Sequence, residues 1–249
     1  MSCGRPGIST APDTTEDALL GGRVRLLQPR RGYRVAVDAV LLAAAANVQP
    51  GARTLDLGAG VGAVGLCLAA RVAGCSVTGL ELQSALAELA ERNARLNGWT
   101  DRMRIVVHDL AHPLPGDLGL FDHVVTNPPY LAAAVADPSP DPAKALATVE
   151  SSADLACWLA VATATAKPTG TVTLIHRLDR LDEVLGGLER LGWGDLAVKR
   201  LPPAPRVLVR ARRGSAARHD SAPLVLHRTE GGYTDDAEAI LRHAAPLAF

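Results

Sequence analysis

The segment Asn127-Pro128-Pro129-Tyr130 carries the clearest chemical signal in the sequence. Its consecutive prolines remove two backbone donors and stiffen the turn, which leaves the Asn127 side-chain oxygen and the Pro128 carbonyl to accept hydrogens from a substrate amine. Tyr130 adds an aromatic face for a planar group. We therefore assign Asn127, Pro128, Pro129 and Tyr130 as candidate catalytic residues that would orient an NH2 group for reaction.

A second cluster joins Asp56 to Gly58, Gly60 and Gly62, between an apolar segment and an expected helix. Glycines permit tight turns and a close approach of a ligand to the backbone. Their spacing also satisfies the dinucleotide fingerprint, so the glycines alone do not separate a nicotinamide cofactor from S-adenosylmethionine. Asp56 favours the second, because its charge would repel a pyrophosphate and attract the amino and sulfonium groups of S-adenosylmethionine.

Two further acids, Glu81 and Asp109, stand at the ends of the next two expected strands. A carboxylate at the first position can accept both ribose hydroxyls, and one at the second can accept an adenine amino hydrogen. With Asp56 and the three glycines they predict an S-adenosylmethionine site, which Asn127 is also expected to touch. We expect no metal, since three histidines near strand ends lack ligand spacing: His108, His112 and His176.

An alternation of strands and helices must position these groups. Strands are expected at 24–28, 53–57, 76–81, 104–108, 121–126 and 170–176. Helices are expected at 36–47, 83–97, 150–166 and 178–191, and a further helix should follow the glycine turn and run to about residue 73. Residues 195–201 and 206–211 are expected to pair as an antiparallel hairpin. Repeated β-α-β units predict an α/β fold with a doubly wound, mostly parallel sheet, whose carboxyl edge gathers the site. We expect a flexible tail over residues 1–20 and a single domain over 21–249.

The composition narrows the class of protein. The chain has 249 residues, of which 48% are hydrophobic and 21% charged, so it is not disordered. Its 26 basic and 26 acidic residues exclude a globally basic nucleic-acid binder, but two arginine runs, at 23–34 and 199–218, could contact RNA phosphates or be solvated faces. No segment predicts a membrane span, and Met1–Thr15 lacks a signal-peptide pattern, so we expect a cytoplasmic protein.

At the Asp56–Gly62 loop, Glu81, Asp109 and the Asn127–Tyr130 turn, the chain resembles the Rossmann-like, S-adenosylmethionine-dependent methyltransferases that carry an Asn-Pro-Pro-Tyr motif. The segments 32–42 and 232–241 are also similar to the bacterial tRNA(Val) adenine-N6 methyltransferase family. This resemblance implies a seven-stranded sheet with an antiparallel C-terminal hairpin. It implies a tRNA adenine amine as the methyl acceptor, and places Asp38, before a leucine-rich helix, against the cofactor.

Other functions stay open at this point. A protein-glutamine N5-methyltransferase or a guanine-N2 rRNA methyltransferase would present the same NH2 group to the turn. A cofactor-binding protein without catalysis is the non-enzymatic alternative, which the intact Asn127–Tyr130 turn disfavours. The oligomeric state is not indicated by any pattern in the sequence.

Overall fold

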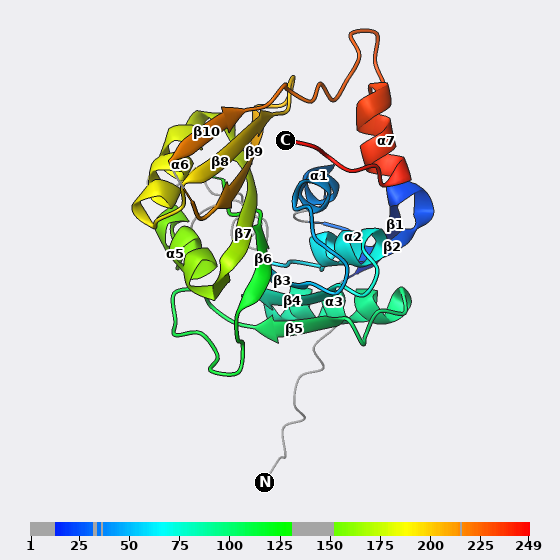
Figure 1. Cartoon of the computed structure of the whole chain (residues 1–249). Helices are drawn as coiled ribbons and strands as arrows, with labels where there is room; N and C mark the ends of the chain where they lie inside the picture. The colour runs from blue at the N-terminus through cyan, green and yellow to red at the C-terminus, as the bar shows by residue number, and fades with distance from the viewer. Residues whose placement is uncertain (1–12, 32–33, 36, 131–151, 215) are drawn as a thin grey trace.

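The structure is a computed structural model, which describes residues 13–31, 34–35, 37–130, 152–214 and 216–249 (Figure 1). Its centre is an eight-stranded sheet with the order β10-β8-β9-β7-β6-β3-β4-β5. The strands are β3 (Arg53–Leu57), β4 (Ser76–Glu81), β5 (Met103–Val107), β6 (Phe121–Thr126), β7 (Ala166–Arg177), β8 (Asp195–Arg200), β9 (Arg206–Arg212) and β10 (Ala217–Asp220).

The sheet is mostly parallel, as the alternating strands and helices predict. Strands β7, β6, β3, β4 and β5 run parallel to one another, while β9 is antiparallel to both β7 and β8. The sequence-predicted hairpin is therefore present. The sheet has eight strands where seven were expected, because β10 adds a parallel edge strand beside β8.

Helices cover both faces of the sheet and form a three-layer fold (Figure 1). One apolar core lies between the sheet and α1 (Val37–Ala45), α2 (Ala63–Arg71), α3 (Ser84–Leu96) and α7 (Asp235–His243). The other lies under α5 (Leu155–Thr165) and α6 (Leu181–Arg190). Four of the five β3 residues are buried, as expected for a central parallel strand covered on both sides. The site at the end of β3 thus rests on a rigid element.

A β-hairpin before α1 corrects the expected flexible tail. Strand β1 (Thr14–Leu19) pairs antiparallel with β2 (Val24–Pro29) across the short η1 turn (Leu20–Gly22). The apolar side of β2 is buried against α2 and α3, which gives these residues a reason to order. Residues 1–12 lie outside the described part of the chain, so the structure corrects the predicted tail over residues 13–20.

The remaining elements differ from expectation mainly at their ends. Helix α5 begins after Asp154, whose carboxylate accepts the Cys157 N–H at 2.8 Å and caps the helix; the expected start at residue 150 lies outside the described residues. Helix α7 was not predicted as a helix, and it packs on η1 and α1. A short η2 turn (Leu178–Arg180) precedes α6. None of the described helices is both long and apolar enough to span a bilayer.

Candidate active site

The three glycines of the loop after β3 all adopt left-handed backbone angles. The φ values are +72° at Gly58, +55° at Gly60 and +84° at Gly62, a region that side chains other than hydrogen disfavour. At Gly58 packing adds a second constraint, since a Cβ there would lie 2.5 Å from Cη2 of Trp158. At Gly60 a Cβ would meet nothing within 4 Å, so this residue faces open space. The loop therefore leaves room for a ligand above its backbone.

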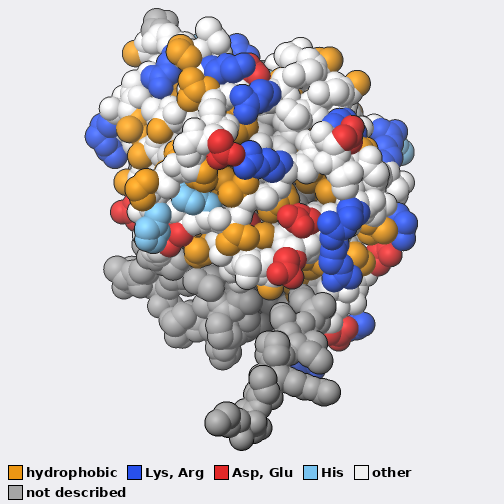
Figure 2. All heavy atoms as spheres, turned by 90° about the horizontal axis from the view of Figure 1, so that it is seen from below, with side chains coloured by type: hydrophobic (Ala, Val, Ile, Leu, Met, Phe, Trp, Pro, Cys, Tyr) orange, Lys and Arg blue, Asp and Glu red, His pale blue; other side chains and the backbone are white. Residues whose placement is uncertain are grey.

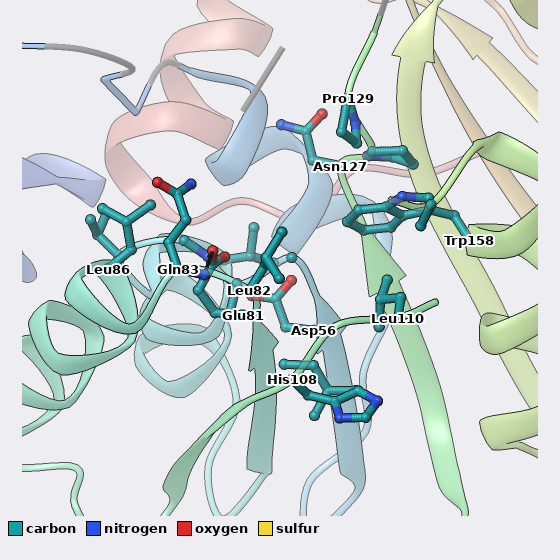
Figure 3. Close-up of a pocket in the computed structure, with 18 of the residues that line it drawn as sticks. Asp56, Glu81, Leu82, Gln83, Leu86, His108, Leu110, Asn127, Pro129 and Trp158 are labelled. Atoms are coloured by element: carbon teal, nitrogen blue, oxygen red, sulfur yellow. Dashed lines mark hydrogen bonds between the residues drawn. The ribbon is translucent and has the colours of Figure 1, made fainter. Parts of the chain in front are cut away.

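A pocket opens over this loop at the carboxyl edge of the sheet (Figure 3). Its walls include every predicted cofactor and catalytic position except two, Asp38 and Gly62. Four segments that are separate in sequence meet there: the Asp56–Gly60 loop, the end of β4, the end of β5 and the turn after β6. This convergence is what parallel strands produce at their carboxyl ends.

Glu81 is 6% exposed and is held by backbone donors. Its Oε2 accepts the Gly60 N–H and its Oε1 accepts the Gln83 N–H, both at 2.8 Å. Burial raises the pKa of Glu81, and these N–H groups oppose that shift. Each carboxylate oxygen keeps a second lone pair. Glu81 is therefore fixed in place and still able to accept hydroxyl donors from a ribose.

Asp56 is 2% exposed and lines the pocket, and its Oδ2 has no hydrogen-bond partner. Burial, and secondly the charge of Glu81, raise the pKa of Asp56 to about 8. A buried carboxylate without a cationic partner is costly, so a positive group brought into the pocket would be strongly favoured. This orphaned acid fits the cation of S-adenosylmethionine and would not tolerate the pyrophosphate of a nicotinamide cofactor.

Asp109 lies two residues beyond the end of β5, on the rim of the pocket. Its Oδ1 accepts the Ala111 N–H at 3.0 Å and the Ser152 hydroxyl at 2.9 Å. The backbone N–H of Ala111 is the main cause that lowers the pKa of Asp109, so the carboxylate is ionised at neutral pH. An ionised acceptor at this place suits the adenine amino group that was expected here from the sequence.

The Asn127–Tyr130 turn forms the opposite wall. The Asn127 side chain enters the pocket, and its Oδ1 is buried without a hydrogen-bond partner. Pro128 and Pro129 line the pocket beside it, and Tyr130 closes its edge. A buried amide oxygen without a donor is rare and costs free energy until a donor arrives. The turn therefore carries an acceptor that is ready for a substrate N–H.

Several pocket residues were not predicted as site residues. The main ones are Val35, Leu82, Gln83, Leu86, His108, Leu110 and Trp158. Leu82, Gln83, His108 and Leu110 lie within two residues of a predicted acid, and this closeness in sequence was the signal that could have found them. Trp158 comes from α5, and nothing in its sequence neighbourhood pairs it with Gly58.

Asp38 is placed differently from the prediction. It is 8% exposed on α1 and is not part of the pocket wall, although its neighbours Val35 and Ala39 are. Its Oδ2 instead accepts the Tyr130 hydroxyl at 2.9 Å and Arg206 Nε at 3.1 Å. The carboxylate thus touches the acceptor side of the site, and a direct contact with the cofactor stays a prediction without a supporting contact.

The first arginine run is largely neutralised by its own hairpin. Arg25 pairs with Glu16 at 2.7 Å, while Arg30 pairs with Asp13 and Arg34 with Asp17, both at 2.8 Å. The acids come from β1 and the residue before it, and the antiparallel pairing of β1 with β2 brings them next to the arginines. On the face in Figure 2, Lys and Arg side chains likewise lie in separate groups with acidic and hydrophobic side chains between them.

The second run divides into two parts. Beside the site, Arg206 pairs with Asp38. On the outer strands β8 and β10, Arg200 and Arg218 pair with Asp220. At the far end of β9, the Arg210 and Arg212 side chains form no hydrogen bond or ion pair with another described residue, although the Arg210 guanidinium lies 4.4 Å from the centroid of the Phe249 ring. Both line a hollow with Asp195, His219 and Phe249. The Arg210 and Arg212 side chains, which are the part of this run best placed for an external anion, therefore lie away from the carboxyl edge of the sheet.

Comparisons with known proteins agree with this geometry. The profile of the methyltransferase small domain family matches residues 34–140. A tRNA1(Val) (adenine(37)-N6)-methyltransferase of Aeromonas hydrophila is 31% identical over 216 residues, which cover 83% of this chain and 87% of that protein. The protein of the same name from Serratia proteamaculans is 29% identical and covers 85% and 83%.

Solved structures share the fold. A predicted O-methyltransferase of Agrobacterium tumefaciens superposes with a TM-score of 0.65 at 28% identity, covering 82% of this chain and 94% of that one. A geranyl diphosphate C-methyltransferase of Streptomyces coelicolor, at 16% identity and a TM-score of 0.55, covers 71% and 75% and shows the fold alone. The orphaned Asp56, the tethered Glu81 and these relatives agree: the chain belongs to the S-adenosylmethionine-dependent tRNA1(Val) (adenine(37)-N6)-methyltransferase family.

Proposed function

We propose that this protein methylates the exocyclic N6 amine of an adenine in tRNA, with adenine 37 of a valine tRNA as the first position to test. The observation that carries the proposal is the buried, unpartnered Oδ1 of Asn127 on a proline-stiffened turn that shares a pocket with Asp56 and Glu81. The named activity of the relatives supplies the base and the RNA.

The cofactor half of the pocket is assigned to Asp56, Gly58, Gly60, Glu81 and Asp109. When bound, S-adenosylmethionine supplies a methyl group on a positively charged sulfur. Glu81 and Asp109 would hold hydroxyl and amino donors, and Asp56 would balance the positive charge. Gly62 supports the loop from below: it precedes α2, and a Cβ there would lie 3.2 Å from that of Ala90.

The acceptor half orients the amine. Asn127 Oδ1 and the Pro128 carbonyl would each accept one hydrogen of the NH2 group, which turns the nitrogen lone pair out of the plane of the base. Holding this lone pair toward the methyl donor is most of what an in-line displacement requires. The adenine must leave any stack to enter the pocket. No strong general base is needed, since the methylated amine is acidic enough to lose its proton afterwards.

The test is a product analysis. Purified protein, methyl-labelled cofactor and unmodified tRNA are incubated, and the nucleosides are identified by mass spectrometry. We expect labelled N6-methyladenosine, absent with Asn127→Ala. Labelled N2-methylguanosine, or label found only in added protein substrates at glutamine, would overturn the assignment to adenine.

We further infer that RNA phosphates contact the unpaired cations of β9, Arg210 and Arg212. These two residues alternate onto one face of β9 at the end away from Arg206, and lie about 13 Å and about 20 Å from Arg206 along the strand. Phosphate contacts fix the position of an RNA on the protein without reading its sequence. The separation of Arg210 and Arg212 from the pocket therefore suits an RNA whose backbone extends beyond the target base.

Binding measurements at several salt concentrations test this footprint. Arg210→Gln with Arg212→Gln should weaken tRNA binding, and each lost phosphate contact should reduce the salt slope by roughly 0.7–0.9. The matched control is Arg25→Gln with Arg30→Gln, whose charges are already paired with Glu16 and Asp13. If the control pair weakens binding more than the β9 pair, the footprint is wrong.

A further inference from the structure

Asp38, Tyr130 and Arg206 form a contact group beside the pocket, drawn from three distant parts of the chain. The Asp38 Oδ2 accepts the Tyr130 hydroxyl at 2.9 Å and Arg206 Nε at 3.1 Å. The side chains of Asp38 and Arg206 are 11% and 27% exposed, so the ion pair is mostly shielded from water. A shielded, charge-assisted pair restrains its members more than an exposed one does.

Arg206 also covers one face of the tyrosine ring. Its guanidinium carbon lies 4.6 Å from the centroid of the Tyr130 ring, within the range of a cation–π contact. Burial alone would lower the pKa of Arg206, but the hydrogen bond and charge of Asp38 outweigh it and raise the pKa. The guanidinium is therefore charged at any working pH and keeps its place over the ring.

The register of the sheet explains why Arg206 can reach this position. Arg206 is the first residue of β9 and pairs with Arg177, the last residue of β7. The antiparallel hairpin thus returns the chain to the carboxyl edge, beside the turn after β6. Tyr130 also meets the ring of His176 edge-on, with centroids 5.5 Å apart. Burial lowers the pKa of His176 to about 4, so this ring is neutral at pH 7 and does not repel Arg206.

We propose that Asp38 and Arg206 are positioning residues, which hold the Tyr130 ring at the orientation in which the target adenine stacks on it. The proposal rests on the proposed function for the identity of the base. A base that stacks on Tyr130 has to use the face opposite Arg206 or displace that side chain. The carboxylate of Asp38 fixes the hydroxyl end of the ring and the guanidinium fixes its plane, so the two residues together determine which way the base faces Asn127.

Kinetics on tRNA test the functional part, with Asp38→Asn, Arg206→Gln and Tyr130→Ala as variants. We expect Asp38→Asn and Arg206→Gln each to raise the KM for tRNA several-fold with a smaller loss of kcat. Arg206→Lys, which keeps the charge, should restore part of the loss. In the Tyr130→Ala background, Arg206→Gln should add almost nothing. Arg200→Gln is the matched control, since Arg200 pairs with Asp220 away from the turn and should leave KM unchanged.

Calorimetry with S-adenosylhomocysteine separates this role from cofactor binding. The dissociation constant should stay within about twofold of wild type in Asp38→Asn, because Asp38 is not part of the pocket wall. A tenfold weaker S-adenosylhomocysteine with an unchanged KM for tRNA would make Asp38 a cofactor ligand and overturn the proposal. Independent, multiplicative effects of Arg206→Gln and Tyr130→Ala would overturn it as well.

The flip rate of the Tyr130 ring tests whether Asp38 and Arg206 hold it, without any activity measurement. The chain has three tyrosines, so the ring signals in an NMR spectrum with labelled tyrosine can be assigned by substitution. Ring flips of Tyr130 should be slower in the wild type than in Asp38→Asn or Arg206→Gln. Equal flip rates in the wild type and the two variants would contradict the proposal that Asp38 and Arg206 hold the ring. Absence of N6-methyladenosine from wild-type reactions, with slow flips retained, would contradict only the assignment of the base.

Discussion

The two halves of the pocket are built in different ways. In the cofactor half, the Asp56–Gly62 loop, Glu81 and Asp109 come from successive parallel strands, and Glu81 and Asp109 are held mainly by backbone N–H groups nearby. In the acceptor half, the turn after β6 is rigid up to Pro129, but Tyr130 is held by side chains from α1 and β9. The acids of the first half are therefore held mainly by backbone donors, and the tyrosine of the second half is held by side chains.

This difference predicts which amino-acid substitutions each half of the pocket can tolerate. Backbone donors around Glu81 do not change when a side chain is replaced, so the cofactor half tolerates substitution at its periphery. The acceptor half depends on an ion pair between residues 168 positions apart, so a change far along the chain reaches the target base. We expect variants of the two halves to separate cleanly into effects on cofactor affinity and effects on turnover or RNA.

The largest effect is expected in the acceptor half, at Asn127. Asn127→Ala removes the unpartnered acceptor and should lower kcat by about 10²–10³, as for other preorganised polar groups, while S-adenosylhomocysteine still binds. Steady-state kinetics at saturating tRNA and cofactor measure it. Asn127→Asp keeps an acceptor oxygen and should retain more activity. Near-wild-type turnover of Asn127→Ala would move the chemistry to other residues and remove the contrast between the halves.

The next effect is expected in the cofactor half, at Glu81. Loss of hydrogen bonds to a charged carboxylate costs about 1.5–3 kcal/mol, so Glu81→Ala should weaken S-adenosylhomocysteine by roughly 10- to 100-fold. Calorimetry measures this, and Glu91→Ala on the exposed side of α3 is the control. Tight NADH binding with no response to S-adenosylhomocysteine would show that the cofactor half has been misassigned.

The smallest effect concerns pH and Asp56. Since the pKa of Asp56 is raised to about 8 in the empty pocket, the acid is mostly protonated at pH 7 and must lose its proton to face a cation. Affinity for S-adenosylmethionine, whose sulfonium stays charged over this range, should therefore rise by about tenfold between pH 7 and pH 9. Calorimetry in buffers of different ionisation enthalpy should show almost one proton released at pH 7. The same pH dependence in Asp56→Asn would assign it to another group.

The strands at the centre of the sheet could be predicted from the sequence, whereas some contacts between distant elements could not. Strand ends at Leu57, Glu81 and Thr126 follow from apolar runs that stop at chemistry-bearing residues, and these strands were predicted with their observed bounds. The pairing of Asp38 with Tyr130 could not be predicted, because it depends on how α1 crosses the sheet. Strand β1 was missed for a similar reason, since its polar residues order only when β2 pairs with them.

Gly58 and Trp158 show how one contact limits the sequences this fold can adopt. The indole ring occupies the space that a side chain at position 58 would need. Among natural variants, any residue larger than glycine at position 58 should therefore appear together with a smaller residue at position 158, and the two columns of an alignment should covary. Replacing Trp158 with a smaller residue to enlarge the pocket would also loosen the loop, and would therefore gain substrate range at the cost of cofactor affinity.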